Sequence, residues 1–251
     1  MSDARIKLRW LDPRDPDEAF PDPVEALHEP GGLLAIGGDL SITRLLRAYS
    51  NGIFPWYNPD EPILWWSPEP RTVLEPARLH RSRSLRRAIR RQDFAITVDE
   101  RFHAVIAGCS GPRRHQDGTW LGPDMIQAFA AMHAAGHAHS IEVWRDGRLI
   151  GGVYGVAIGH AYFGESMFSL EPDASKLALH YLALQLERWD FPIIDCQVSS
   201  PHLLSLGAVE WPRRRFIAEL RAGVARRRPP GRWQFDIDLP QDRVHLPSDW
   251  S

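Results

Sequence analysis

Residues 151–169, GGVYGVAIGHAYFGESMFS, constrain the fold of this chain more than any other stretch. Apolar residues fill nearly every position that is not glycine, which is the pattern of strands covered on both faces. Glycines weaken a strand unless another backbone or a ligand comes close, so their density predicts a groove beside the sheet. Glu165 lies inside this apolar run, where an unpaired carboxylate is costly. We therefore expect Glu165 to have a function or a charged partner.

A second apolar run with polar residues inside it follows at 193–198, IIDCQV. Strand alternation places Asp195 and Gln197 on one face and Cys196 on the other. Asp195 could orient or deprotonate an attacking amine while Gln197 stabilises an oxyanion. The alternative is a buried polar pair that caps a loop. Cys196 is interpreted as a core cysteine rather than a nucleophile, because apolar residues flank it.

The net charge is only −2, but residues 78–91 hold seven arginines, one histidine and no acid. Three- and four-residue spacing predicts a helix from Ser82 or Ser84 that carries one basic stripe. A solvated face is the alternative. Seven like charges without acids repel one another unless a polyanion neutralises them, so the run favours a nucleic-acid partner.

The cysteines and the amino-terminal residues predict a cytoplasmic protein. Two cysteines without a CxxC pair are too few for a disulfide framework, and no apolar signal segment is visible. No apolar run reaches the about 18 residues that a membrane span needs, so we expect no membrane contact.

The chain is predicted to divide at a proline-rich link, 58–70, into lobes covering residues 1–62 and 63–251. The first is expected to be a small α/β lobe with a helix at 42–49, capped by Asp39 or Ser41. The second ends in a proline-rich tail. Its predicted elements are a helix at 124–135, strands at 141–145, 149–158 and 160–168, a helix at 173–189, a strand at 193–198 and a short helix at 201–206.

This order predicts an α+β fold whose larger lobe has a mixed, mostly antiparallel sheet. One parallel strand pair should flank the helix at 173–189, and ligands favour the carboxyl ends of such strands. GNAT-type acyltransferases use the same order, so the larger lobe is GNAT-like by analogy of element order. The glycine-rich loop with which that family holds coenzyme A is missing, as is a P-loop. We therefore expect a different acyl donor.

Three other features have two interpretations each. Lys176, in the first turn of a predicted helix, either faces an anion such as Glu165 or a substrate, or is an ordinary surface residue. The histidines around Gly136 could suggest zinc, but that glycine ends the helix between them, so no metal site is expected. Five aromatic residues either pack at a lobe interface or stack on a nucleobase: Phe54, Trp56, Tyr57, Trp65 and Trp66.

Over residues 31–216 the chain resembles the bacterial leucyl/phenylalanyl-tRNA–protein transferases. The resemblance is carried by the blocks GGLLAIGGDL, GIFPWY, ILWWSPEPR, LHRSRSLRR, GTWL, GHAHSIEVW, GGVYGVAIGHAYFGESMFS, ASKLAL, IDCQV and HLLSLGA. It implies transfer of Leu, Phe or Met from aminoacyl-tRNA to a protein whose N-terminal residue is Arg or Lys, which marks that protein for N-end-rule degradation. It also implies that no metal or organic cofactor takes part.

The resemblance further implies roles for individual residues. Asp195 and Gln197 become the catalytic pair, with Glu165 contacting the donor or orienting the acceptor. Trp56 is expected to stack on the terminal adenosine. The apolar pocket for the donor side chain is expected to consist of Val153, Tyr162, Met167, Leu179 and Ile194. Phosphates of the acceptor stem are expected to bind Arg83, Arg87, Arg90 and Arg91. Phe129 stands where a tyrosine is expected after the GTW block.

The residues leave two questions open. An aminoacyl ester is already activated, so positioning supplies much of the rate, and Asp195 either takes a proton or only orients the amine. A different class of protein, an RNA-binding module whose strand carboxylates are structural, is the alternative to an enzyme.

Overall fold

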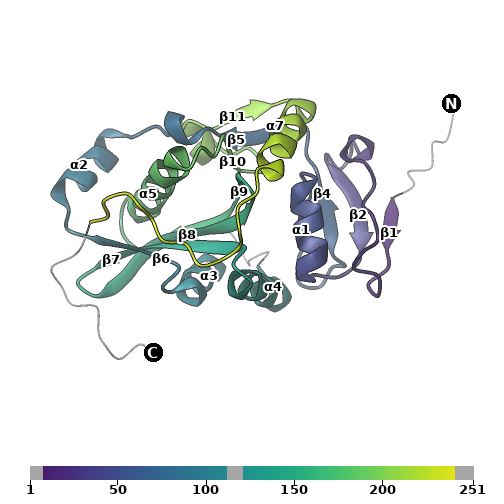
Figure 1. Cartoon of the computed structure of the whole chain (residues 1–251), viewed down its shortest axis with the longest axis horizontal. Coiled ribbons are helices and arrows are strands. Elements are labelled where there is room, and N and C mark those ends of the chain that lie inside the picture. Colours follow the sequence, from purple (N-terminus) through teal and green to yellow (C-terminus); the bar gives the residue numbers. More distant parts are fainter. Residues whose placement is uncertain (1–7, 112–120, 241–251) are drawn as a thin grey trace.

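The computed structural model describes residues 8–111 and 121–240, which form two sheets and the helices that cover them (Figure 1). The small sheet has the strand order β1 (Arg9–Leu11), β2 (Leu33–Gly37), β4 (Leu64–Trp66) and β3 (Phe54–Pro55). The large sheet has the order β11 (Val209–Trp211), β5 (Arg71–Leu74), β10 (Ile194–Asp195), β9 (Ala161–Ser169), β8 (Arg148–Ile158), β7 (Ala138–Arg145) and β6 (Ala95–Val98).

The periodic segments form helices as predicted. Ser41 caps the first helix and Ser82 caps the arginine-rich one, each accepting a backbone N–H bond in the first turn. The α-helices are α1 (Ile42–Ser50), α2 (Arg83–Arg91), α3 (Phe102–Ser110), α4 (Pro123–Ala134), α5 (Ala174–Arg188), α6 (Pro201–Ser205) and α7 (Arg213–Ala225). Two single turns of 3-10 helix complete the set, η1 (Pro23–Glu25) and η2 (Pro76–Arg78).

The large sheet confirms the expected α+β architecture. Each neighbouring strand pair is antiparallel except β9 and β10, which are parallel and joined through α5. The predicted strand at 193–198 is much shorter than expected, because β10 ends at Asp195. A connection through a helix is what a parallel pair requires, so the order of the elements and the sheet agree.

Each face of the large sheet has its own hydrophobic core. One contains Tyr154 and Phe163 with residues of α1, α3, α4 and α7. The other contains Val153 and Tyr162 with residues of α2 and α5. Because side chains on a strand alternate, neighbouring residues of β8 and of β9 enter different cores. The first core also includes residues of the small sheet, so α1 joins the two lobes (Figure 1).

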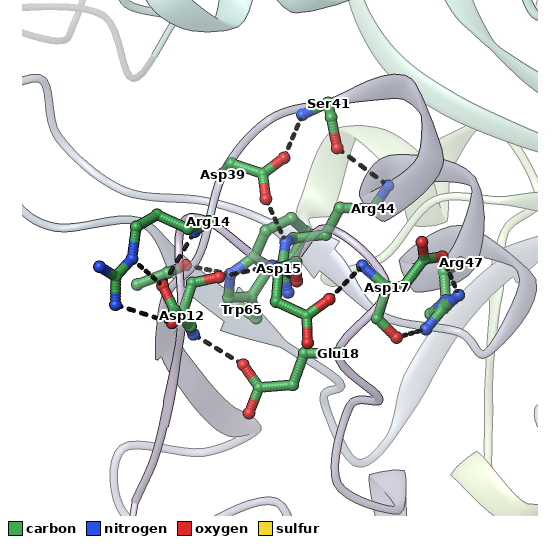
Figure 2. A network of polar contacts seen from close by, with 11 residues as sticks. Asp12, Arg14, Asp15, Asp17, Glu18, Asp39, Ser41, Arg44, Arg47 and Trp65 are labelled. Carbon is green, nitrogen blue, oxygen red and sulfur yellow. Dashed lines mark hydrogen bonds and ion pairs between the residues drawn. The ribbon is translucent and has the colours of Figure 1, made fainter.

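The small sheet extends past the boundary expected at residue 62, since β4 pairs with both β2 and β3. Two arginines of α1 hold the segment between β1 and β2 in place (Figure 2). The buried Arg44 donates to Asp39 at 2.8 Å and to the carbonyl of Asp12 at 2.9 Å, and Arg47 donates to Asp17 at 2.7 Å. These bonds connect α1 to the segment that follows β1.

Two glycines of β8 allow helices to pack closely against the sheet. A Cβ at Gly151 would lie 2.6 Å from the Cβ of Ala174 on α5, and one at Gly152 would lie 3.1 Å from Val105 on α3. The expected groove is therefore wrong for these two glycines, whose small size allows close packing. No helix within the described ranges combines the length and apolar character needed to cross a bilayer.

Candidate active site

A cavity opens where β10 stops and β9 continues. The two strands share only the pairs Tyr162–Ile194 and Phe163–Asp195. The backbone N–H of Leu170 donates to the carbonyl of Ile150. Because only alternate residues of β9 form such bonds to β8, the backbone N–H and C=O of Met167 point away from β8. The open strand edge at Met167 thus lies at the carboxyl end of a parallel pair, the usual location of ligand sites in such sheets.

The cavity has a volume of about 390 Å³, which is within the range of small-molecule sites. Its apolar lining, which we call the apolar wall, consists of Leu74, Val153, Met167, Leu179, Ile194 and Leu203. The polar lining consists of Glu165, Ser166, Ser175, Cys196, Gln197, Ser200 and His202. A mainly apolar cavity with a few polar groups can hold a hydrophobic side chain and orient the functional group attached to it.

Glu165 is the extra residue of a β-bulge. Gly164 pairs with Gly155 and Ser166 pairs with Tyr154, so Glu165 has no partner on β8. A bulge interrupts the alternation of side chains and often re-aims one of them beside an active site. The carboxylate of Glu165 reaches both the cavity and the hydroxyl of Tyr49 on α1, which donates to Oε1 at 2.8 Å.

Burial raises the pKa of Glu165 to about 8, and the negative charge of Asp195 contributes to the rise. The hydrogen bond from Tyr49 and the charge of Arg71 act in the opposite direction. Gln197 also donates to Oε1, at 3.4 Å, so neither of these bonds uses Oε2. The carboxyl group can therefore gain or lose a proton near neutral pH.

Asp195, in contrast, is held in a buried ion pair. Arg71 donates from Nε to Oδ1 at 2.8 Å and from a terminal nitrogen to Oδ2 at 2.6 Å, the two-point geometry of a strong charge-assisted pair. The rings of Phe54 and Phe216 lie 4.9 and 4.6 Å from the guanidinium carbon. Both oxygens of Asp195 are thus occupied, and Asp195 does not line the cavity.

The ion-paired carboxylate of Asp195 holds the backbone of Gln197 in place. Asp195 Oδ1 accepts a bond of 3.0 Å from the backbone N–H of Gln197, whose φ is +56°. This left-handed backbone is unfavourable for a residue with a side chain and needs such support. The expected alternation, with Asp195 and Gln197 on one strand face and Cys196 on the other, is wrong, because β10 ends at Asp195. Gln197 nevertheless faces the cavity and lies within reach of Glu165.

Comparison with known proteins places this site in a family. The model of the leucyl/phenylalanyl-tRNA protein transferases matches residues 73–221, and that of their N-terminal domain matches residues 38–69. A leucyl/phenylalanyl-tRNA–protein transferase of Thiobacillus denitrificans is 56% identical over 217 residues, which are 86% of this chain and 95% of that protein. One of Alkalilimnicola ehrlichii is 50% identical over 240 residues, 95% of this chain and 93% of that protein. The chain belongs to the leucyl/phenylalanyl-tRNA protein transferase family.

The two matched regions of this transferase family meet at Glu165: Tyr49, which donates to Glu165, lies in the N-terminal match, and Glu165 and Gln197 lie in the longer one. Among solved structures, a GCN5-related N-acetyltransferase from Kribbella flavida aligns with 66% of this chain and 58% of its own length. The identity is 13% and the TM-score is 0.33. A likeness at this TM-score carries no inference about the reaction.

Four of the five residues expected for the apolar pocket of a family member line the cavity: Val153, Met167, Leu179 and Ile194. Tyr162 is the exception. At Tyr162 the sheet is still closed, because this residue pairs with Ile194, and its ring is buried 5.8 Å from that of Trp233. Trp56 also lies outside the cavity lining; it is 44% exposed beside Trp66 in the small lobe.

The arginines expected to bind phosphates are exposed on α2, away from this cavity: Arg83, Arg87, Arg90 and Arg91. Lys176 donates to Asp173 at 2.8 Å, so a neighbour on the same helix explains it. Cys196 lines the cavity instead of lying wholly in the core, and burial raises the pKa of its thiol. Gly118, Thr119 and Trp120 of the GTW block lie outside the described residues.

Two residues of the site carried no signal that identified their role. Tyr49 and Arg71 are separated from their carboxylate partners by 116 and 124 positions. An arginine at the start of the apolar run RTVL was the available hint, because a buried arginine requires an acid nearby. Sequence patterns cannot show which acid this is.

Proposed function

We propose that this protein transfers an aminoacyl group from aminoacyl-tRNA to the α-amine of a protein whose first residue is Arg or Lys. The donor amino acids in this proposal are Leu, Phe and Met, and the product is a substrate of N-end-rule degradation in the cytoplasm, where aminoacyl-tRNA is made. The observation that carries the proposal is the cavity itself, whose lining combines apolar side chains with Glu165 and Gln197.

The apolar wall fits the side chain of the donor. Val153 comes from β8, Leu179 from α5 and Ile194 from β10, and Met167 on β9 adds an adaptable thioether side chain. Unbranched or γ-branched donors can extend into such a cavity, whereas a charged side chain would lose its hydration without finding a partner. Membership in the family supports leucine and phenylalanine; methionine rests on the resemblance alone.

Glu165, in the polar lining of the cavity, provides a base for the attacking amine. An α-amino group ordinarily has a pKa of about 7.7–8.0, close to the pKa of about 8 of Glu165. A proton therefore moves between them at little cost, which is the condition for effective general base catalysis near neutral pH. Glu165 takes the proton of the amine as the new C–N bond forms. The C–O bond of the ester breaks, and its electron pair leaves with the 3′ oxygen of the tRNA, which takes up the proton that Glu165 had accepted.

Gln197 acts on the substrate in this mechanism, and Asp195 acts through Gln197. The amide of Gln197 donates one N–H to Glu165 and has a second for the oxyanion that develops on the ester carbonyl. Asp195 is a positioning residue, because its contact with the backbone N–H of Gln197 holds that residue in place. The proposal includes no metal or organic cofactor, since an aminoacyl ester is already activated.

The remaining contacts of the donor lie outside the cavity. We place the terminal adenosine on the exposed ring of Trp56. The acceptor-stem phosphates are placed on four arginines of α2: Arg83, Arg87, Arg90 and Arg91. Phe129 is fully buried and packs edge-on against Tyr154 at 5.3 Å, so the hydroxyl that the resemblance leads one to expect has no place in this mechanism.

Incubation with labelled leucyl-tRNA and a peptide that begins with Arg tests the proposal. We expect label in that peptide and in one beginning with Lys, but little in the same peptide with an acetylated amine or with Ala first. Binding of tRNA without any labelled peptide would overturn the proposal and favour an RNA-binding module. Equal labelling of the Arg and Ala peptides would overturn the acceptor specificity alone.

A further inference from the structure

A second cavity, of about 610 Å³, lies between η2, α2 and α5, apart from the one at the end of β10. We call it the arginine-lined cavity, because its polar residues are Arg78, His80, Arg81, Arg86, Arg90 and His180. Arg90 belongs both to this cavity and to the stripe assigned to the acceptor stem, whereas Arg78, Arg81 and Arg86 belong to the cavity alone. Arg83 and Arg87, which are in that stripe, do not line the cavity.

The lining is cationic and contains no acid. Arg78 pairs with Glu75 at 2.8 Å, but that glutamate lies outside the lining. Within residues 8–111 and 121–240, neither Arg81 nor Arg90 forms an ion pair. Guanidinium groups that converge on one cavity repel each other unless an anion lies between them.

His180 gives an independent indication of a ligand. This residue of α5 is only 6% exposed and lines the cavity, and its Nδ1 has no hydrogen-bond partner in the described part of the chain. Burial, together with the charge of Arg81, lowers the pKa of its imidazole to about 4, so the ring is neutral. Buried polar atoms nearly always have a partner, so an unpartnered nitrogen beside a cationic cavity calls for a hydrogen-bonding ligand.

We infer that the arginine-lined cavity is a phosphate-binding site, occupied during the reaction by a backbone phosphate of the donor tRNA. Arginine forks match the oxygens of phosphate, and a neutral histidine can add one N–H bond. The position supports the tRNA as the source, since His180 directly follows Leu179, which lines the proposed active-site cavity. Identifying the occupant as tRNA rests on the proposed function, whereas the phosphate chemistry does not.

Equilibrium binding of deacylated tRNA at several salt concentrations tests this inference without requiring transfer. Arg81→Gln and Arg86→Gln change exposed side chains, so neither should affect folding. We expect each to weaken binding several-fold at low salt and to reduce the salt slope by about 0.7–0.9 per lost phosphate contact. Arg221→Gln on α7, an exposed arginine outside the cavity, is the matched control and should change neither quantity.

The His180 variants separate a ligand contact from packing. His180→Leu should weaken tRNA binding at an unchanged salt slope, because a neutral group is lost, and His180→Gln should recover part of the affinity by restoring a donor. Pyrophosphate binding, measured by calorimetry with the same variants, distinguishes the source of the phosphate. Pyrophosphate affinity that depends on Arg81, with tRNA affinity unchanged, would overturn tRNA as the occupant. No change in either measurement, or an equal effect of Arg221→Gln, would overturn the phosphate site.

Discussion

Replacing Glu165 by Gln should make the protein more stable, and the gain should grow with pH. The carboxyl pKa is raised from an ordinary 4.5 to about 8, so the folded state binds the proton more tightly than the unfolded chain. For a group of this kind stability is highest below pH 4.5 and is lost as the pH rises through 8. Glutamine keeps the size of the side chain and an oxygen that accepts the Tyr49 hydroxyl, but it does not titrate.

The size of the effect follows from the two pKa values. At about 1.36 kcal/mol per unit, the difference in unfolding free energy between the variant and the parent should increase by up to about 2.7 kcal/mol between pH 6 and pH 9. The open side of Glu165 faces the cavity, so this is an upper limit. For a chain of this length the difference in Tm should widen by roughly 5 to 10 °C at most.

Differential scanning calorimetry of both proteins at pH 6, 7, 8 and 9 measures this difference. Glu142, whose pKa burial raises to about 7, titrates in both proteins and therefore cancels. Glu210→Gln, at an exposed position of β11, is the matched control and is measured under the same four conditions. A pH-independent difference for Glu165→Gln would refute the reasoning, because it would mean that the folded state does not favour the protonated carboxyl group.

Four further changes test the site and the tRNA contacts. Asp195→Asn removes the counter-charge of the buried Arg71, so denaturant titrations should show a loss of about 3–5 kcal/mol, while Asp195→Leu with Arg71→Met should regain stability but not transfer activity. Tyr49→Phe removes a hydrogen bond that lowers the pKa of Glu165, so the pH–kcat profile should move to higher pH. Val153→Phe fills the apolar wall and should reduce kcat/KM for phenylalanyl-tRNA about tenfold more than for leucyl-tRNA. Three exposed arginines of α2 are replaced together by alanine: Arg83, Arg87 and Arg90. The salt slope of tRNA binding should then fall by about two to three, with transfer from a minimal aminoacyl-adenosine unchanged; equal loss on both donors would contradict the phosphate contacts.

The elements that the sequence predicted correctly are those specified by local patterns. The helix at 173–189 has an apolar stripe and forms as α5, and the strands around Glu165 form a hairpin because their apolar residues fill both cores. The strand at 193–198 was predicted too long. Its apolar residues resemble a strand, but only tertiary contacts determine that β10 ends at Asp195 and that Gln197 turns into a left-handed conformation.

The candidate site was predictable in its polar residues but not in their roles. Glu165 and Gln197 stood out because polar groups are rare inside apolar runs, and both line the cavity. The partner of each carboxylate could not be found, since Tyr49 and Arg71 are more than 100 positions away. Without those partners the sequence left open whether Asp195 takes a proton or only orients the amine, and we propose that Glu165 takes it.

The two carboxyl groups differ because the lobes surround them differently. Asp195 forms an ion pair with Arg71, whose guanidinium lies between two aromatic rings. Glu165 accepts a hydrogen bond from the hydroxyl of Tyr49 on α1, and burial and the negative charge of Asp195 raise its pKa. The two groups can therefore take different roles: Asp195 is held in an ion pair, whereas Glu165 can exchange a proton near pH 8. Tyr49 belongs to the small lobe and Glu165 to the large one, so the contact that holds the proposed base exists only when both lobes are packed together. Substitutions at the α1 interface should therefore impair transfer even though they touch neither substrate.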